Sequence, residues 1–141
     1  MSSTRLAQQL VIAASITAVL SLAGCGSATE TEPADLSGTW KQSNSASEDA
    51  YQEATISGDT IKIDWVSDGG STTSLYWSGT YDAPAEPGSY TWDSVRNEDE
   101  TDAALLASQD ASKRFAYDDG VISYEASALG TTTVIELERE G

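Results

Sequence analysis

The chain has 141 residues, with 23 acidic side chains against 7 Lys plus Arg, no His and a single Cys. The absence of His excludes Ser-His-Asp and Cys-His catalysis, and one Cys permits neither an internal disulfide nor a Cys-rich zinc or iron–sulfur site. A formal net charge of -16 opposes nucleic-acid binding, which depends on Lys and Arg displacing phosphate counterions, so we expect no nucleic-acid partner.

Residues 1–24 have the composition of a secretory signal. A short polar start, with Arg5 as its only charge, precedes an apolar run over residues 10–24 that contains few polar side chains. The run is shorter than the about 20 apolar residues that a membrane-spanning helix needs. We therefore expect residues 1–24 to be a signal peptide that is removed from the mature protein.

The apolar run ends in Leu22, Ala23, Gly24 and Cys25. This sequence resembles the lipobox of bacterial lipoproteins, in which a Leu and two small residues precede an obligatory Cys. The resemblance implies that the Cys25 thiol receives a diacylglyceryl group and that cleavage makes Cys25 the new N-terminus. Because two acyl chains hold a protein stably where one does not, the expected location is the extracytoplasmic face of the cell membrane. The alternative is that Cys25 is an incidental apolar residue in an uncleaved helix.

Beyond the lipobox, we expect a tether over residues 25–35 and one domain over residues 36–141. The tether is rich in Ser, Thr, Glu and Ala and has no periodicity, as flexible linkers do. The remaining residues suffice for one hydrophobic core but not for two. Residues 25–141 contain all 23 acids and six of the seven bases, so the net charge of the mature protein is -17.

Apolar residues in this domain recur at every second position, as in half-buried strands, and turn residues separate the runs. The pattern predicts an all-β antiparallel meander of seven to nine short strands that closes into a small barrel or sandwich to hide its edges. Residues 102–108 are the only candidate for a helix, and part of the same stretch is also a candidate strand. The expected strands are 38–43, 51–57, 60–67, 72–82, 88–94, 104–109, 113–118, 121–127 and 131–139.

Large aromatic side chains are the most suggestive feature of the domain. Trp65, Trp77 and Trp92 line a ligand pocket or fill the core, and their period-two placement favours the core. If Trp77 points inward, strand alternation places Tyr76 on the outer face, so we predict Tyr76 to be an exposed contact residue.

Two short segments resemble known barrels. Residues 37–40, Ser-Gly-Thr-Trp, and residues 77–81, Trp-Ser-Gly-Thr-Tyr, are similar to strands of avidin-like and lipocalin-like up-and-down barrels. The similarity implies a barrel but supplies no biotin ligand. The mature chain as a whole resembles small lipoproteins of Gram-positive bacteria and their phages, a likeness that agrees with the anchor and implies no activity.

Carboxylates are too numerous for any spacing to single out a catalytic pair, so we expect no enzyme activity and no cofactor. Residues 97–102 place oxygen ligands at alternate positions, as a calcium loop does. However, Asp102 stands where such a loop has Gly, and Ser108 stands where it has a bidentate Glu. We therefore expect a solvated acidic loop and no metal.

Three functions agree with these observations. The first is a lipid-anchored, non-enzymatic domain that binds an unknown envelope protein. The second is a carrier with a small ligand inside a lipocalin-like or avidin-like barrel, and the third is a surface lipoprotein that excludes competing phages. A cavity lined by Trp65, Trp77 and Trp92 favours the carrier, whereas a filled core favours the interaction domain.

Overall fold

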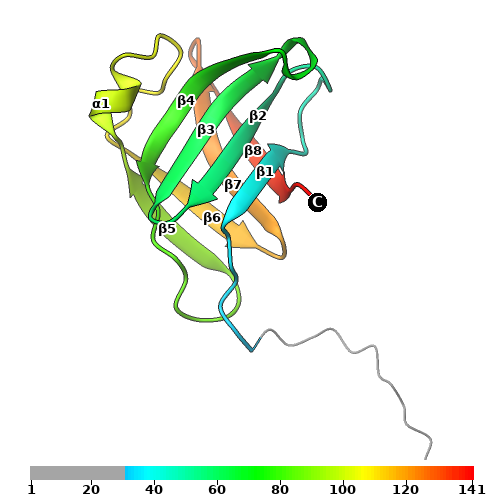
Figure 1. Cartoon of the computed structure of the whole chain (residues 1–141), viewed down its shortest axis with the longest axis vertical. Helices are drawn as coiled ribbons and strands as arrows, with labels where there is room; N and C mark the ends of the chain where they lie inside the picture. The colour runs from blue at the N-terminus through cyan, green and yellow to red at the C-terminus, as the bar shows by residue number, and fades with distance from the viewer. Residues whose placement is uncertain (1–30) are drawn as a thin grey trace, which may run out of the picture.

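The computed structural model describes residues 31–141, which form a single eight-stranded antiparallel sheet curled into a nearly closed barrel (Figure 1). The strand order is β4-β3-β2-β1-β8-β7-β6-β5. Strands that are consecutive in sequence pair with one another except β4 and β5, which are the two edges, and β1 pairs with β8. The strands are β1 (Gly38–Gln42), β2 (Tyr51–Ser57), β3 (Thr60–Ser67), β4 (Thr72–Thr80), β5 (Tyr90–Val95), β6 (Ser112–Asp118), β7 (Val121–Ala128) and β8 (Thr131–Arg139).

The all-β prediction is confirmed, and of the two predicted architectures the structure is the barrel. Two expectations between β5 and β6 are wrong. Residues 104–109 form turns and bends, not a strand, and the short helix α1 (Glu98–Thr101) precedes the predicted position at 102–108. Successive backbone hydrogen bonds from Thr101, Ala104 and Ala107 to residues three or four positions earlier keep the chain turning through this stretch.

The barrel closes at a seam between β4 and β5. Gly79 and Arg96 form an isolated antiparallel bridge there. The indole Nε1 of Trp77 donates to Ser94 Oγ at 3.0 Å, and the Val95 amide donates to Thr80 Oγ1 at 2.9 Å. Side-chain hydrogen bonds thus supplement the short main-chain ladder across the seam.

Beyond the bridge, the segment from α1 to β6 follows the free edge of β4. The amides of Asn97 and Ser108 donate to the carbonyls of Ser78 and Tyr76, each at 2.8 Å. This segment satisfies backbone acceptors of β4 that have no strand partner.

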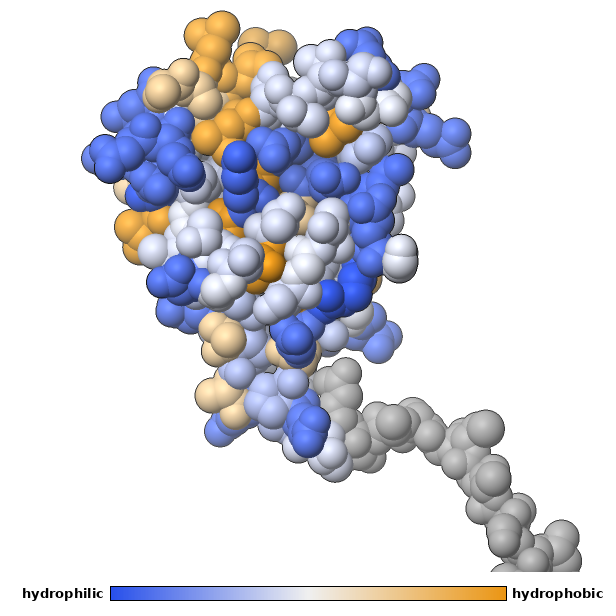
Figure 2. Space-filling view, viewed as in Figure 1, coloured by the Kyte–Doolittle hydropathy of each residue, from blue (hydrophilic) through white to orange (hydrophobic). Residues whose placement is uncertain are grey.

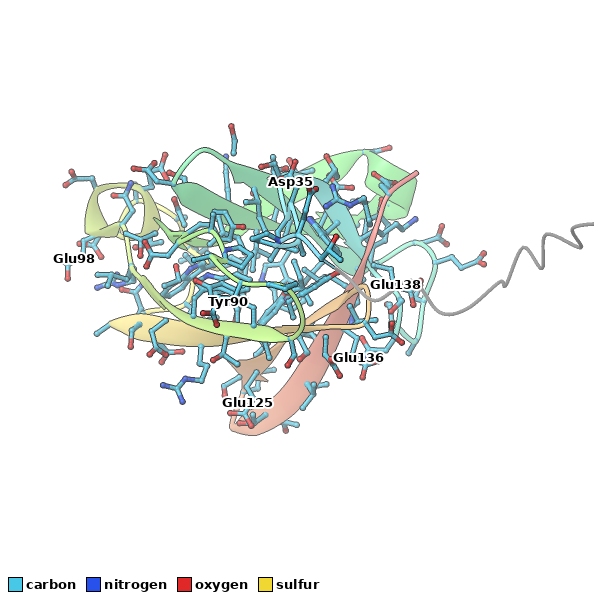
Figure 3. All side chains as sticks on the ribbon, turned by 90° about the horizontal axis from the view of Figure 1, so that it is seen from below. Asp35, Tyr90, Glu98, Glu125, Glu136 and Glu138 are labelled. Atoms are coloured by element: carbon cyan, nitrogen blue, oxygen red, sulfur yellow. The ribbon has the colours of Figure 1, made fainter. Side chains whose placement is uncertain are left out.

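Alternate side chains of all eight strands fill the barrel. The core contains large side chains that are essentially unexposed, among them Trp40, Trp77 and Phe115. Figure 3, viewed along the barrel from below, shows side chains crossing the interior while Glu125 and Glu136 lie on its outer side. Successive ring contacts, with centroids 5.0–6.4 Å apart, form a continuous aromatic row through the core: Trp65, Tyr76, Tyr124, Phe115, Trp92 and Tyr90.

The first described residues enter the barrel at its lower end in Figure 1. Leu36 is buried in the core, and its carbonyl accepts a 2.9 Å hydrogen bond from the Trp40 indole. Arg139 donates to the carbonyls of Ser37 and Asp35, which ties the entering chain to the end of β8. Within residues 31–141, neither α1 nor the 3-10 turn at Asp68–Gly70 has the length and apolar character needed to cross a bilayer.

Candidate binding face at the upper end of the barrel

Four connections form the upper end of the barrel in Figure 1, and we call this the distal end because the described chain enters at the opposite one. They are residues 43–50, 68–71, 96–111 and 129–130. Two open clefts lie side by side there, with volumes of about 360 and 400 Å³. Trp65 and Ala128 line both clefts, so the Trp65 indole forms the wall between them.

The two clefts are walled by different loops. The first lies between the β1–β2 connection and β8, and Ala46, Ala50 and Ile135 give it an apolar lining. The second lies between Leu106 and Leu129, which come from the α1–β6 and β7–β8 connections. Clefts of this character are typical of sites that receive apolar groups.

Three leucines beside the second cleft are exposed to solvent. Leu105 and Leu129 are fully exposed and Leu106 is 56% exposed. We call Leu105, Leu106 and Leu129 the leucine patch. Figure 2 shows apolar residues gathered at this end, over the loop after α1 and the β7–β8 turn. Isolated exposed leucines are common, but neighbouring ones beside an apolar cleft are typical of interaction sites.

The backbone at Leu129 adds a second unusual feature. Leu129 and Gly130 form the two-residue turn between β7 and β8, with φ values of +52° and +78°. Such turns favour Asn or Asp at the first position, and the β6–β7 turn accordingly contains Asp119 and Gly120. A bulky side chain with positive φ is strained, and strain of this kind is concentrated at functional sites.

Tyr76 is not the exposed contact residue that the sequence predicts. Ile63 pairs with Trp77 and Asp64 pairs with Leu75, so Tyr76 is the extra residue of a β-bulge in β4. The bulge interrupts strand alternation, and both Tyr76 and Trp77 are therefore buried. The Tyr76 ring contacts Trp65 at a centroid distance of 5.3 Å and lines the second cleft.

Polar groups lie below the Trp65 wall. Gln52 pairs with Trp65 across β2 and β3, is fully buried, and accepts a hydrogen bond from the Tyr124 hydroxyl. Burial raises the pKa of Tyr124 well above its usual range, so the hydroxyl remains a donor. Among the described residues, Gln52 Nε2 and the Tyr76 hydroxyl have no hydrogen-bond partner. Two hydrogen-bond donors thus remain free below the clefts.

The three predicted tryptophans do not line one common pocket. Trp77 and Trp92 are buried in the filled core, and only Trp65 reaches the clefts. Because these tryptophans belong to a filled core and line no common cavity, their placement favours the interaction domain over the carrier. The lipobox residues Leu22, Ala23, Gly24 and Cys25 lie outside the described residues.

Sequence reasoning missed two cations that stabilise the distal end from within. Lys113 lies on the interior face of β6, on the same side as Phe115 and Tyr117, and this period-two spacing is the signal that could have revealed it. Its Nζ donates to the Glu125 carbonyl at 3.1 Å and pairs with Asp110 at 3.3 Å. The Ser108 hydroxyl and, secondarily, Lys113 lower the pKa of Asp110, which keeps the Asp110 carboxylate ionised at neutral pH.

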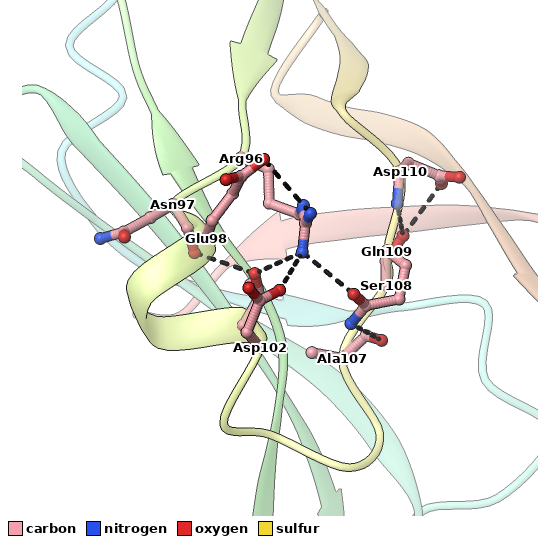
Figure 4. Close-up of polar contacts among 9 residues, drawn as sticks. Arg96, Asn97, Glu98, Asp102, Ala107, Ser108, Gln109 and Asp110 are labelled. Carbon is pink, nitrogen blue, oxygen red and sulfur yellow. Dashed lines mark hydrogen bonds and ion pairs between the residues drawn. The ribbon is translucent and has the colours of Figure 1, made fainter.

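Arg96 is the second cation, and it organises the segment after β5 (Figure 4). Its guanidinium contacts Asp102 at 2.8 Å, Thr101 Oγ1 at 3.0 Å and Gln109 Oε1 at 3.1 Å. Glu98 lies 3.5 Å away. The predicted acidic loop at 97–102 is therefore folded around an arginine, and within residues 31–141 no three His, Cys, Asp or Glu side chains form a group suited to a metal ion.

Comparisons with protein-family models, with curated proteins and with solved structures found no match to this chain.

Proposed function

We propose that the protein is a lipid-anchored, extracytoplasmic binding protein without catalytic activity. In this proposal Cys25 carries the lipid, residues 26–35 form the tether, and the distal end of the barrel contacts an envelope protein. The observation that carries the binding role is the leucine patch beside the Trp65 clefts, because apolar side chains are exposed there at a strained turn.

The position of the distal end supports the anchored arrangement. The described chain enters the barrel at one end, and the leucine patch lies at the other (Figures 1 and 2). A tether attached to Cys25 would therefore hold the barrel with its clefts directed away from the membrane. The acidic surface agrees with a domain that stands away from the membrane, since an anionic leaflet repels carboxylates within a Debye length of about 8–10 Å.

The anchor is tested by Cys25→Ser in the native host. The expected result is loss of the lipid mass and release of most of the protein from the membrane fraction, because the serine hydroxyl does not replace the thiol nucleophile. Ser27→Ala, two residues later, is the matched control and should remain membrane-bound. Unchanged mass and unchanged fractionation of Cys25→Ser would contradict lipidation.

The binding role is tested with the full chain as bait in a solubilised envelope extract. Leu106→Ser together with Leu129→Asn should remove a captured protein without unfolding the barrel, because both side chains are exposed. Val95→Thr changes another exposed apolar residue that lines neither cleft, and it should leave capture intact. Equal capture by all three chains would exclude the distal end as the binding face.

A further inference from the structure

Exposed charges in the four connections around the leucine patch have one sign. The four connections of the distal end contain eight acidic residues and one base, Arg96. Arg96 is largely buried and engaged with Asp102, whereas the side chains of Asp102 and Asp110 are 64% and 61% exposed. The acids are Glu48, Asp49, Asp68, Glu98, Asp99, Glu100, Asp102 and Asp110.

Bases on the adjoining strands offset this charge only in part. Lys41 lines a surface cleft together with Glu48, and the exposed Arg114 is paired with Asp93. Lys113 is buried, with a side-chain exposure of 5%, and its ammonium group is directed into the barrel against the rings of Tyr76 and Trp77. Arg96 and Lys113 are thus engaged in internal contacts. The surface that a partner meets is an apolar centre with an acidic rim.

We propose that the distal end binds a basic protein segment in which one or two large apolar side chains are flanked by Lys or Arg. This inference rests on the proposed function and names the chemistry of the partner. The apolar side chains would enter the clefts on either side of Trp65, beside Leu106 and Leu129. The flanking cations would face the acidic rim, which increases the rate of association and selects against acidic partners.

The same charges disfavour the other occupants of an apolar face. A second copy of this chain would bring two acidic rims together, and like charges opposed across an interface are unfavourable. An anionic membrane surface is repelled for the same reason. A basic segment with apolar side chains is the occupant that can both pack against the leucines and pair its cations with the carboxylates.

The proposal is tested by selecting peptides from a random display library against the full chain held in nanodiscs of neutral phosphatidylcholine. Peptides that bind the unaltered chain should contain Leu, Ile or Phe flanked by Lys or Arg, and should lose at least about tenfold in affinity for Leu129→Asn. Asn is a preferred residue at this turn position, so the variant should fold, as circular dichroism will verify.

The outcomes separate the inference from the proposed function. Selected peptides that are apolar but not enriched in Lys or Arg, and that still lose affinity for Leu129→Asn, would overturn the partner chemistry and leave the binding face intact. Peptides that bind Leu129→Asn as well as the unaltered chain, or a library that yields no binder, would overturn both.

Matched charge variants distinguish the acidic rim from the general acidity of the protein. Glu48→Gln with Asp49→Asn removes two exposed charges beside the first cleft, and Asp82→Asn with Glu86→Gln removes two exposed charges at the opposite end. The distal pair should weaken binding of a selected basic peptide at least about threefold more than the opposite pair. Equal effects would overturn the rim as the recognition element.

Discussion

Gly79 lies at the seam of the barrel, where the space beside its Cα is already occupied. A Cβ at this position would stand 2.4 Å from Ser94 Oγ, 2.6 Å from the Val95 carbonyl oxygen and 2.8 Å from the Trp77 indole nitrogen. The Ser94 and Trp77 atoms form one of the hydrogen bonds that close the barrel, so they cannot move away without loss. A glycine here permits the closest approach of β4 to β5.

We expect Gly79→Ala to lower the free energy of unfolding by about 1–3 kcal/mol, the usual cost of forcing an extra carbon into a packed site. Urea denaturation followed by tryptophan fluorescence measures this change. Gly141→Ala makes the same substitution where no atom lies within 4 Å, and it should leave the urea midpoint unchanged. A midpoint for Gly79→Ala equal to that of the unaltered chain would mean that β4 and β5 separate at the seam without loss of stability.

At the scale of secondary-structure elements, the two hairpins at β6–β7 and β7–β8 have the same turn geometry but different residues. Asp119 and Leu129 occupy the first turn position with φ values of +46° and +52°, and Gly follows each. The aspartate agrees with the preference of this turn, whereas the leucine opposes it and is also exposed. The β7–β8 turn is thus less stable with Leu129 than it would be with Asn or Asp, and it lies at the face where we propose binding.

Exchanging the two residue types should have opposite effects on stability. Leu129→Asn should raise the free energy of unfolding by about 0.5–1 kcal/mol, because it relieves an unfavourable turn residue. Asp119→Leu should lower it by a similar amount, because it introduces the same strain at the other end. Urea midpoints of both variants, compared with the unaltered chain, provide the measurement. A destabilised Leu129→Asn would show that the leucine has a structural role.

The elements differ in how far the sequence predicts them. The hydrophobic period of two and the turn residues are local signals, so β2, β3, β6, β7 and β8 lie close to their predicted bounds. The β4 bulge is not a local signal. It depends on the pairing of β4 with β3, and it reverses the predicted side of Tyr76.

Other features of the candidate site depend on tertiary contacts in the same way. Residues 104–109, a predicted strand, have no strand partner, because Arg96 and the edge of β4 hold the segment in turns. The leucine patch is formed by residues from two connections that meet only in the folded barrel. Its individual leucines are visible in the sequence, but their proximity is not.

Across the whole molecule, the net charge makes the folded domain repel itself. Residues 25–141 carry a net charge of -17, and compaction brings those charges together. Raising sodium chloride from about 10 mM to about 150 mM shortens the Debye length from about 30 Å to about 8 Å. Salt should therefore stabilise the fold, whereas it should weaken the proposed complex, whose long-range electrostatic term is attractive.

We expect this change in salt to raise the melting temperature by several degrees, since about 1 kcal/mol corresponds to roughly 4–8 °C for a domain of this size. Over the same range, the affinity for a basic apolar peptide should fall. Calorimetry and peptide titration on one preparation measure both effects, and sucrose at equal osmolality controls for solute exclusion. A melting temperature that falls with salt would show that attractive ion pairs, such as Asp93 with Arg114, outweigh the repulsion. Because the two effects have opposite signs, a uniform effect of salt on the folded state cannot produce both.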